Sequence, residues 1–176
     1  MNKIYFISDC HFNHDKEFIW KERGYNSIKE MNEDIVKKWN SIIDDNDIIY
    51  NLGDLALGNV DEAIKYIKQL KGQIHLIRGN HCTDNKVERY KELDNIIDIK
   101  YADMIKYKKW NFYLSHYPTM MGCCADQKKL YNISGHTHSK DKFENKEHKV
   151  YNVAADAHDC KPVEIEQIIK DIKEIE

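Results

Sequence analysis

The first clear pattern in the chain is IYFISDCH, residues 4–11. Its apolar half predicts a short buried strand, and the ligand-type residues follow at the C-terminal end of that strand. Successive side chains of an extended backbone point to opposite sides, so we expect Asp9 and His11 to converge while Cys10 turns away. A carboxylate and an imidazole held together form half of a metal site. Since Asp and His are also ordinary turn residues, this pair alone is weak support for one.

Four further predicted strands end in the same kind of polar cluster. They cover residues 48–52, 74–77, 110–114 and 130–134. The ligand-type residues that follow them are, in order, Asp54, Asn80 with His81, His116, and His136 with His138. A single such histidine is usually a core or surface residue, but five clusters in the same position favour one catalytic metal site. No cysteine is needed for it, so a structural zinc finger is disfavoured.

The segments between these strands determine the fold class. Ser27 and Glu30 have capping-box spacing before an amphipathic helix that extends to Ile42, and a second helix is expected at about 60–70. Alternating strands and helices predict an α/β layer with its functional groups at the strand ends. The second half reads as a hairpin of 103–107 and 110–114 with another strand at 149–153, which favours antiparallel pairing. Pro162 is expected to open a last helix.

Composition narrows the class of protein. The 176 residues suit a single domain, 1–176, and the 27 basic and 30 acidic residues are spread evenly, for a formal charge of −3. A general nucleic-acid binder is therefore disfavoured, and no apolar run is long enough for a membrane span or signal segment. The five scattered cysteines, with Cys123-Cys124 expected in a loop, fit reduced thiols in the cytoplasm. A homo-oligomer is compatible with the sequence.

The polar clusters resemble the motifs of the calcineurin-like metallophosphoesterases from residue 8 to residue 138. The matching blocks are Asp9-Cys10-His11, Gly53-Asp54, Gly79-Asn80-His81, Ser115-His116 and Gly135-His136-Thr137-His138. The resemblance implies a four-layer α-β-β-α sandwich with two metal ions at the strand ends. It assigns one ion to Asp9, His11, Asp54 and His138, and the other to Asp54, Asn80, His116 and His136, with Asp54 shared.

The implied chemistry is hydrolysis of a phosphate ester by a hydroxide that bridges the two ions. Asp9 and Asp54 leave part of the metal charge uncompensated, so the centre would attract a phosphate anion. Imidazole-rich ligation suits Mn, Fe, Co, Ni or Zn, and manganese is favoured here. The resemblance makes Asp54, Asn80 and His81 the catalytic residues, with His81 protonating the leaving oxygen.

Departures from the family pattern narrow the substrate. Leu57 and Gly58 stand where phosphoprotein phosphatases of this family carry Asp and Arg, and Cys82 replaces the usual acidic residue after the GNH block. We therefore expect a phosphodiesterase, or a phosphatase for nucleotide-like or other small monoesters. Two alternatives are a catalytically weak metal-binding scaffold for partner proteins and a nuclease, although a nuclease would need a basic groove.

Three more residues are candidates for substrate binding. His14 lies near the first cluster, but a solvent-facing histidine at a helix start is an equal alternative. Arg78 could bind phosphate, although an arginine at a strand end more often forms a structural ion pair. His158 would reach the site only if its loop folds back.

Overall fold

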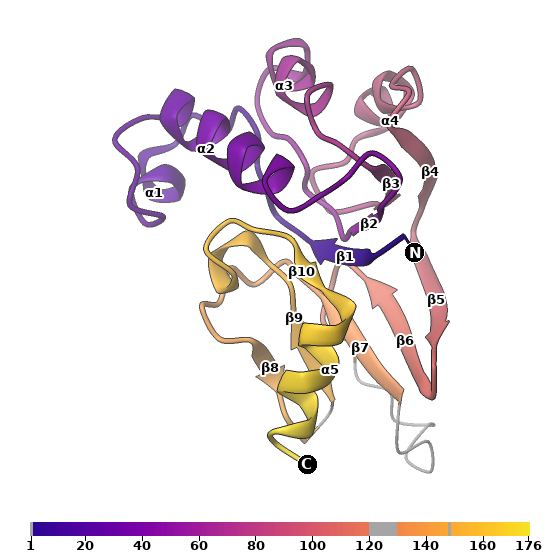
Figure 1. Cartoon of the computed structure of the whole chain (residues 1–176). Helices are drawn as coiled ribbons and strands as arrows, with labels where there is room; N and C mark the ends of the chain where they lie inside the picture. Colours follow the sequence, from indigo (N-terminus) through magenta and orange to yellow (C-terminus); the bar gives the residue numbers. More distant parts are fainter. Residues whose placement is uncertain (1, 120–129, 148) are drawn as a thin grey trace.

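The computed structural model describes residues 2–119, 130–147 and 149–176, so Cys123-Cys124 lies outside the described residues. Two five-stranded sheets form the framework (Figure 1). The first sheet has the order β10-β1-β2-β3-β4. Its strands are β1 (Ile4–Ile7), β2 (Ile48–Asn51), β3 (Gln73–Ile77), β4 (Ile96–Lys100) and β10 (Val163–Glu164). The strands β1 to β4 run parallel, which brings their C-terminal ends to one edge.

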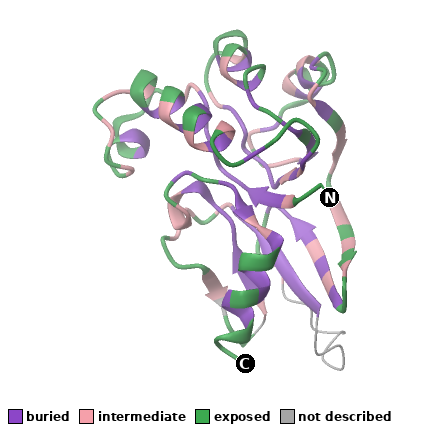
Figure 2. Cartoon of the chain, in the orientation of Figure 1, coloured by how far each residue is buried: buried purple, intermediate pink, exposed green. Residues whose placement is uncertain are grey.

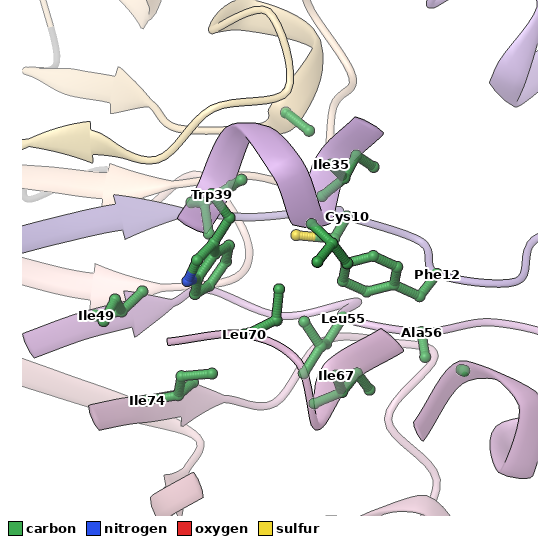
Figure 3. Packing of buried hydrophobic residues seen from close by; sticks show 14 of the residues in the cluster. Cys10, Phe12, Ile35, Trp39, Ile49, Leu55, Ala56, Ile67, Leu70 and Ile74 are labelled. Carbon is green, nitrogen blue, oxygen red and sulfur yellow. The ribbon is translucent and has the colours of Figure 1, made fainter. Parts of the chain in front are cut away.

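Four helices pack with the first sheet. They are α1 (Glu17–Trp20), α2 (Ile28–Asn40), α3 (Val60–Ile67) and α4 (Asp84–Tyr90). The predicted cap of α2 is confirmed, because the Ser27 side chain accepts a hydrogen bond from the Glu30 amide at 3.1 Å. Trp39 of α2 packs in one buried cluster with Ile49 and Ile74 of the sheet (Figure 3). Cys10 points into this cluster, as the sequence predicted.

The second sheet has the order β5-β6-β7-β9-β8. Its strands are β5 (Ala102–Tyr107), β6 (Trp110–Ser115), β7 (Leu130–Ser134), β8 (Phe143–Asn145) and β9 (Val150–Asn152). The β5–β6 hairpin is antiparallel as expected, but β6, β7 and β9 run parallel, so the prediction of antiparallel pairing was wrong for them. The chain segments between these strands are long enough to return to the same end of the sheet.

The end of the chain also differs from the expectation. Pro162 precedes β10, which pairs antiparallel with β1, and the helix α5 (Ile165–Lys173) begins only afterwards. Pairing with an open sheet edge therefore outweighs the preference of proline for a helix start. The helix packs with the second sheet, where the Tyr151 hydroxyl donates to Asp171 at 2.6 Å. A short 3-10 helix, Ala155–Ala157, lies between β9 and β10.

The fold is the predicted α/β sandwich of two sheets with helices. Burial is concentrated in the central strands, while the edge strand β5 and the outer helix faces are exposed or half-buried (Figure 2). A second buried cluster joins Phe6 of β1 and Leu52, directly after β2, to Phe112 and Ile133 of the second sheet. This shared core fixes the strand ends of both sheets relative to one another. Among the described residues, no helix has the length and apolar character needed to cross a membrane.

Candidate metal centre

The backbone at the strand ends adopts left-handed conformations. The residues with positive φ include Asp9 at 56°, His11 at 53°, Asp54 at 50°, His136 at 74° and His138 at 55°. The expectation that Asp9 and His11 converge through an extended backbone was therefore wrong in its mechanism. Tight turns aim these side chains, at a cost of about 1–3 kcal/mol each, and such strain is typical of functional sites.

Hydrogen bonds between the loops hold these turns together. The amide of Asp9 donates to the Gly53 carbonyl and the amide of His11 donates to the Asp54 carbonyl, both at 3.0 Å. The loops of the second sheet join them, because the His136 amide donates to Asp9 Oδ2 at 2.8 Å. Gly135 allows this approach, since a Cβ there would overlap Ser8 Oγ and Asp9 Oδ2. These hydrogen bonds therefore connect the loops at the strand ends of the first sheet to those of the second sheet.

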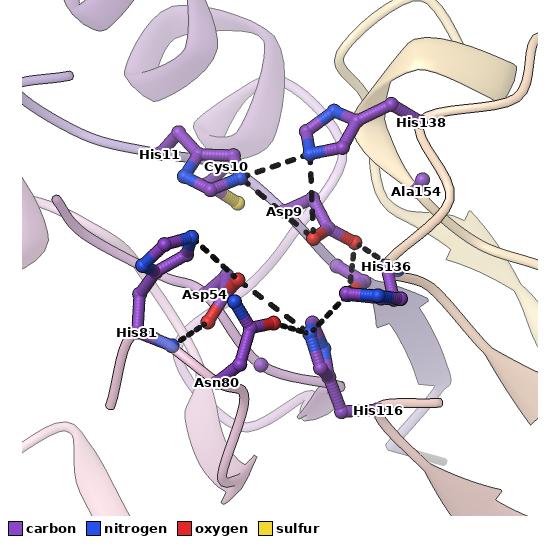
Figure 4. A network of polar contacts seen from close by, with 12 residues as sticks. Asp9, Cys10, His11, Asp54, Asn80, His81, His116, His136, His138 and Ala154 are labelled. Atoms are coloured by element: carbon purple, nitrogen blue, oxygen red, sulfur yellow. Dashed lines mark hydrogen bonds and ion pairs between the residues drawn. The ribbon is translucent and has the colours of Figure 1, made fainter. Parts of the chain in front are cut away.

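Asp9, His11 and His138 form the first group of potential ligands (Figure 4). Asp9 Oδ1 lies 3.7 Å from His11 Nε2 and 3.8 Å from His138 Nε2, and the two imidazole nitrogens are 3.1 Å apart. Asp9 is fully buried, and its Oδ1 has no hydrogen-bond partner. An unpaired buried carboxylate oxygen facing two imidazole nitrogens is explained by a cation bound between them.

The second group consists of Asp9, Asp54 and His116, all buried. His116 Nε2 lies 3.5 Å from Asp54 Oδ2 and 2.8 Å from Asn80 Oδ1. His136 Nδ1 lies 3.2 Å from the same His116 nitrogen. All seven predicted ligands thus come together, six of them on turns after β1, β2, β6 and β7, and Asn80 on the turn after β3. Asp9 is the member common to both groups, and the sharing of Asp54 stays a prediction.

The protonation of two of the imidazoles matches metal ligation, whereas the hydrogen bond with Asp156 raises the pKa of His138. Burial lowers the pKa of His11 to about 2 and also lowers the pKa of His136, so both imidazoles are neutral near pH 7. Neutral imidazole nitrogens and carboxylate oxygens suit a transition-metal ion better than Mg²⁺ or Ca²⁺. Burial raises the pKa of Asp9 in the protein alone, a tendency that a bound cation would reverse. The donor set therefore fits divalent metal ions.

Asp156 and Arg23 support the first group, and the sequence did not point to either. Asp156 Oδ2 lies 2.9 Å from His138 Nδ1 and 2.8 Å from Arg23 Nη2. Arg23 also donates to the carbonyls of Asp9 at 2.7 Å and Cys10 at 3.0 Å. Although burial opposes it, hydrogen bonds from His138 and Arg23 hold the pKa of Asp156 below its usual range. Asp156 thereby orients the His138 ring toward the metal group.

His81 and His14 lie beside the metal groups. The His81 amide donates to Asp54 Oδ1 at 2.9 Å, and its Nε2 lies 3.9 Å from Asp54 Oδ2. The His81 side chain is 42% exposed, so it can reach a bound ligand. The rings of His14 and His11 are 5.2 Å apart, and burial lowers the pKa of His14. Both histidines line a pocket of about 540 Å³ next to His138.

Arg78 and His158 have partners outside the metal groups. Arg78 pairs with Asp84 at 2.7 Å and donates to the Cys82 carbonyl and the Tyr101 hydroxyl. His158 Nε2 lies 2.8 Å from the Asn152 carbonyl. Neither residue lines the pocket beside His81. Their roles in substrate binding stay predictions.

Comparisons with known proteins find similar sequences over half or more of the chain. A family model described as calcineurin-like phosphoesterase matches residues 2–171. An uncharacterised protein of Methanocaldococcus jannaschii is 33% identical over 181 residues, which cover 97% of this chain and 91% of that protein. The gene 66 protein of Mycobacterium phage L5 is 29% identical over 92 residues, covering 51% of this chain and 44% of the phage protein.

Solved structures show the same fold. A protein of unknown function from Aquifex aeolicus superimposes with a TM-score of 0.73 at 26% identity, covering 98% of this chain and all of that one. A structure described as a novel archaeal phosphodiesterase has a TM-score of 0.50 at 19% identity, covering 85% of this chain and 82% of that one. The second likeness concerns the fold alone.

Proposed function

Because the chain belongs to the calcineurin-like phosphoesterase family, we propose that it is a binuclear metal-dependent hydrolase of phosphodiesters or small, nucleotide-like phosphate esters. Asp9, His11 and His138 would hold one ion, and Asp54, Asn80, His116 and His136 the other, with a carboxylate shared between them. Manganese is the preferred candidate among Mn, Fe, Co, Ni and Zn. When bound, two such ions supply an acidified water and positive charge for the phosphate oxygens.

The observation that carries the proposal is the unpaired Oδ1 of buried Asp9, the residue that the two ligand groups have in common. A buried carboxylate oxygen without a partner is costly unless a cation binds to it, so this atom supports the metal binding that the proposed hydrolysis requires. The left-handed turns at five of the ligand positions add a cost that metal binding can offset. Together these features support a site built for cations.

The residues of the chain have distinct tasks in this proposal. Asp54 fixes the loop after β3 because it accepts a hydrogen bond from the His81 amide. This contact places the His81 imidazole beside the metal groups. His81 is exposed enough to donate a proton to the departing oxygen of a bound ester. Asn80 contributes a neutral amide oxygen next to His116, so it adds a ligand without adding charge.

A substrate panel tests the proposal. The metal-free protein is reconstituted with Mn²⁺ and assayed on bis(p-nitrophenyl) phosphate, p-nitrophenyl phosphate, cyclic nucleotides and nucleoside monophosphates. We expect turnover of at least one class that disappears with chelator and in an Asp54→Asn variant. Absence of turnover on every ester, with both ions bound, would contradict the proposed function and favour a scaffold.

A further inference from the structure

The pocket beside the metal groups is lined by two kinds of side chain. His11, His81 and His138 are its imidazole lining, and Phe18, Ile19 and Leu57 are its apolar lining. Its volume of about 540 Å³ lies in the range of small-molecule sites. The remaining lining residues are His14, Glu22, Lys140 and Asp156. A ligand whose phosphate lies beside the histidines would therefore meet apolar side chains in the same pocket, and we call Phe18, Ile19 and Leu57 the apolar wall.

Phe18 is the unusual member of this wall. Its neighbours in α1, Ile19 and Trp20, are buried, whereas Phe18 is 66% exposed. Its ring lies edge-on to the His14 ring, with centroids 5.8 Å apart and an angle of 87° between the planes. The segment that follows α1 is bound to the loop after β1, because Arg23 donates hydrogen bonds to the Asp9 and Cys10 carbonyls. Phe18 is thus presented to the pocket by an anchored helix.

The charges around the pocket disfavour a second anionic group. Lys140 and Glu22 are both exposed and opposite in sign, and Asp156 is already paired with Arg23. No excess of positive charge remains among these lining residues to bind another phosphate or an acidic peptide. An uncharged group with apolar faces fits the wall better, and aromatic rings gain most from contact with other aromatic rings.

We propose that this pocket binds the leaving group of the ester and that this group carries a flat aromatic ring of about the size of a nucleobase. This inference rests on the proposed function. His81 lines the same pocket, and a proton donor is useful beside the oxygen that departs. In the hydrolysis, the water loses a proton to the solvent and its oxygen bonds to phosphorus, the bond from phosphorus to the leaving oxygen breaks, and that oxygen takes the proton from His81, which the solvent then replaces.

Calorimetric binding of phenylphosphonate and methylphosphonate to the Mn²⁺-loaded protein tests the inference. Both ligands carry the same anionic head, so the ratio of their dissociation constants reports the contribution of the ring. We expect phenylphosphonate to bind about 5-fold or more tightly, which corresponds to the low end of aromatic stacking. In Phe18→Ala this ratio should fall toward one, whereas Phe18→Tyr should keep it.

Ile97→Ala is the matched control, since it truncates another exposed apolar side chain, 51% exposed, on β4. It should keep the wild-type ratio. Equal binding of the two phosphonates by the wild type, or a ratio unchanged in Phe18→Ala, would overturn the inference while leaving the proposed function intact. Failure of the metal-loaded protein to bind either phosphonate would overturn both.

Discussion

Asp9 is the residue on which the geometry of the site depends most. One of its carboxylate oxygens accepts from the Ser8 hydroxyl at 2.5 Å and from the His136 amide, while the other faces His11 and His138 without a partner. The first oxygen is therefore fixed by the protein, and the second is free to bind a cation. Fixing one oxygen orients the other before any ion arrives, which lowers the entropic cost of binding.

Asp156 extends this orientation to His138, and we expect Asp156→Asn to weaken metal binding about 10- to 100-fold. The amide carries no charge, so it polarises the imidazole less than the carboxylate does. The measurement is the Mn²⁺ dissociation constant at a temperature where the variant is folded. Asp159→Asn is the control, because Asp159 is likewise an aspartate in ion pairs, here with Lys38 and Lys161, but its side chain is 70% exposed. Unchanged affinity in Asp156→Asn would remove its orienting role.

His81→Ala tests the proton donor. The variant should keep its metal content and lose roughly 10²–10⁴ in kcat/KM on esters with an alkyl or nucleoside leaving group. The loss of kcat/KM on an aryl ester with an acidic phenol should be much smaller, since the phenolate oxygen departs without a proton. The comparison is made on both ester classes with metal content measured in parallel. A uniform loss would instead assign His81 to binding the phosphate charge.

The residues of the metal groups could be predicted because each follows an apolar run or a glycine at a strand end. Arg23 and Asp156 could not, because they lie 133 residues apart and neither has a motif. Their contact exists only once the turn after α1 and the loop after β9 fold onto the same face. Supporting residues of this kind have no local signal in a single sequence.

At the scale of elements, the turn after β7 brings the second sheet to the first. A Gly135→Ala substitution should destabilise the fold by about 1–3 kcal/mol and reduce bound metal, because the added methyl group displaces Ser8 or Asp9. Gly24→Ala is the control. Gly24 has a φ of +83° and no atom within 4 Å of the added carbon, so this variant should be strained but keep its metal. Full metal content in Gly135→Ala would contradict the close approach of Gly135 to Ser8 and Asp9.

The predicted elements were those with a clear apolar pattern, either periodic as in α2 or continuous as in β2. The short elements β8 and β10, of three and two residues, were missed because such lengths show no periodicity. The strand β4 was missed as well, since Asp98 and Lys100 interrupt its apolar run. The parallel direction of β6, β7 and β9 depends on the path of the connecting segments, which the strand sequences do not record.

At the scale of the whole molecule, the site makes the stability of the metal-free protein dependent on pH. The native pKa of His11, about 2, lies far below the value of about 6.5 expected in the unfolded chain. Below pH 6.5 the unfolded chain therefore binds a proton that the native protein excludes, and the free energy of unfolding falls as the pH falls. The pKa values of His14 and His136 are also lowered, whereas that of His138 is raised and opposes the effect.

Urea unfolding in chelator between pH 8 and pH 5 measures this dependence. We expect stability to decrease below pH 6.5 by up to about 1.4 kcal/mol per pH unit for each excluded proton. His11→Asn should have a smaller slope than the wild type. Equal slopes for the two proteins would show that burial of His11 does not exclude the proton.

Sequence patterns alone do not predict how the two sheets pack on one another. Each strand end could be placed locally, but the packing of one sheet on the other depends on the shared core of Phe6, Leu52, Phe112 and Ile133. The resemblance to a known family supplied this packing in advance. The structure has the same arrangement, with His116 and His136 of the second sheet beside Asp54 and Asp9 of the first.

The most direct test of the account is a titration of the metal-free protein with Mn²⁺ while hydrolysis of bis(p-nitrophenyl) phosphate is followed. The two ligand groups predict that activity rises with added metal and reaches its plateau at about two ions per chain. Elemental analysis at the plateau checks the stoichiometry. A plateau at one ion per chain with full activity, or activity that survives complete removal of metal, would contradict the account.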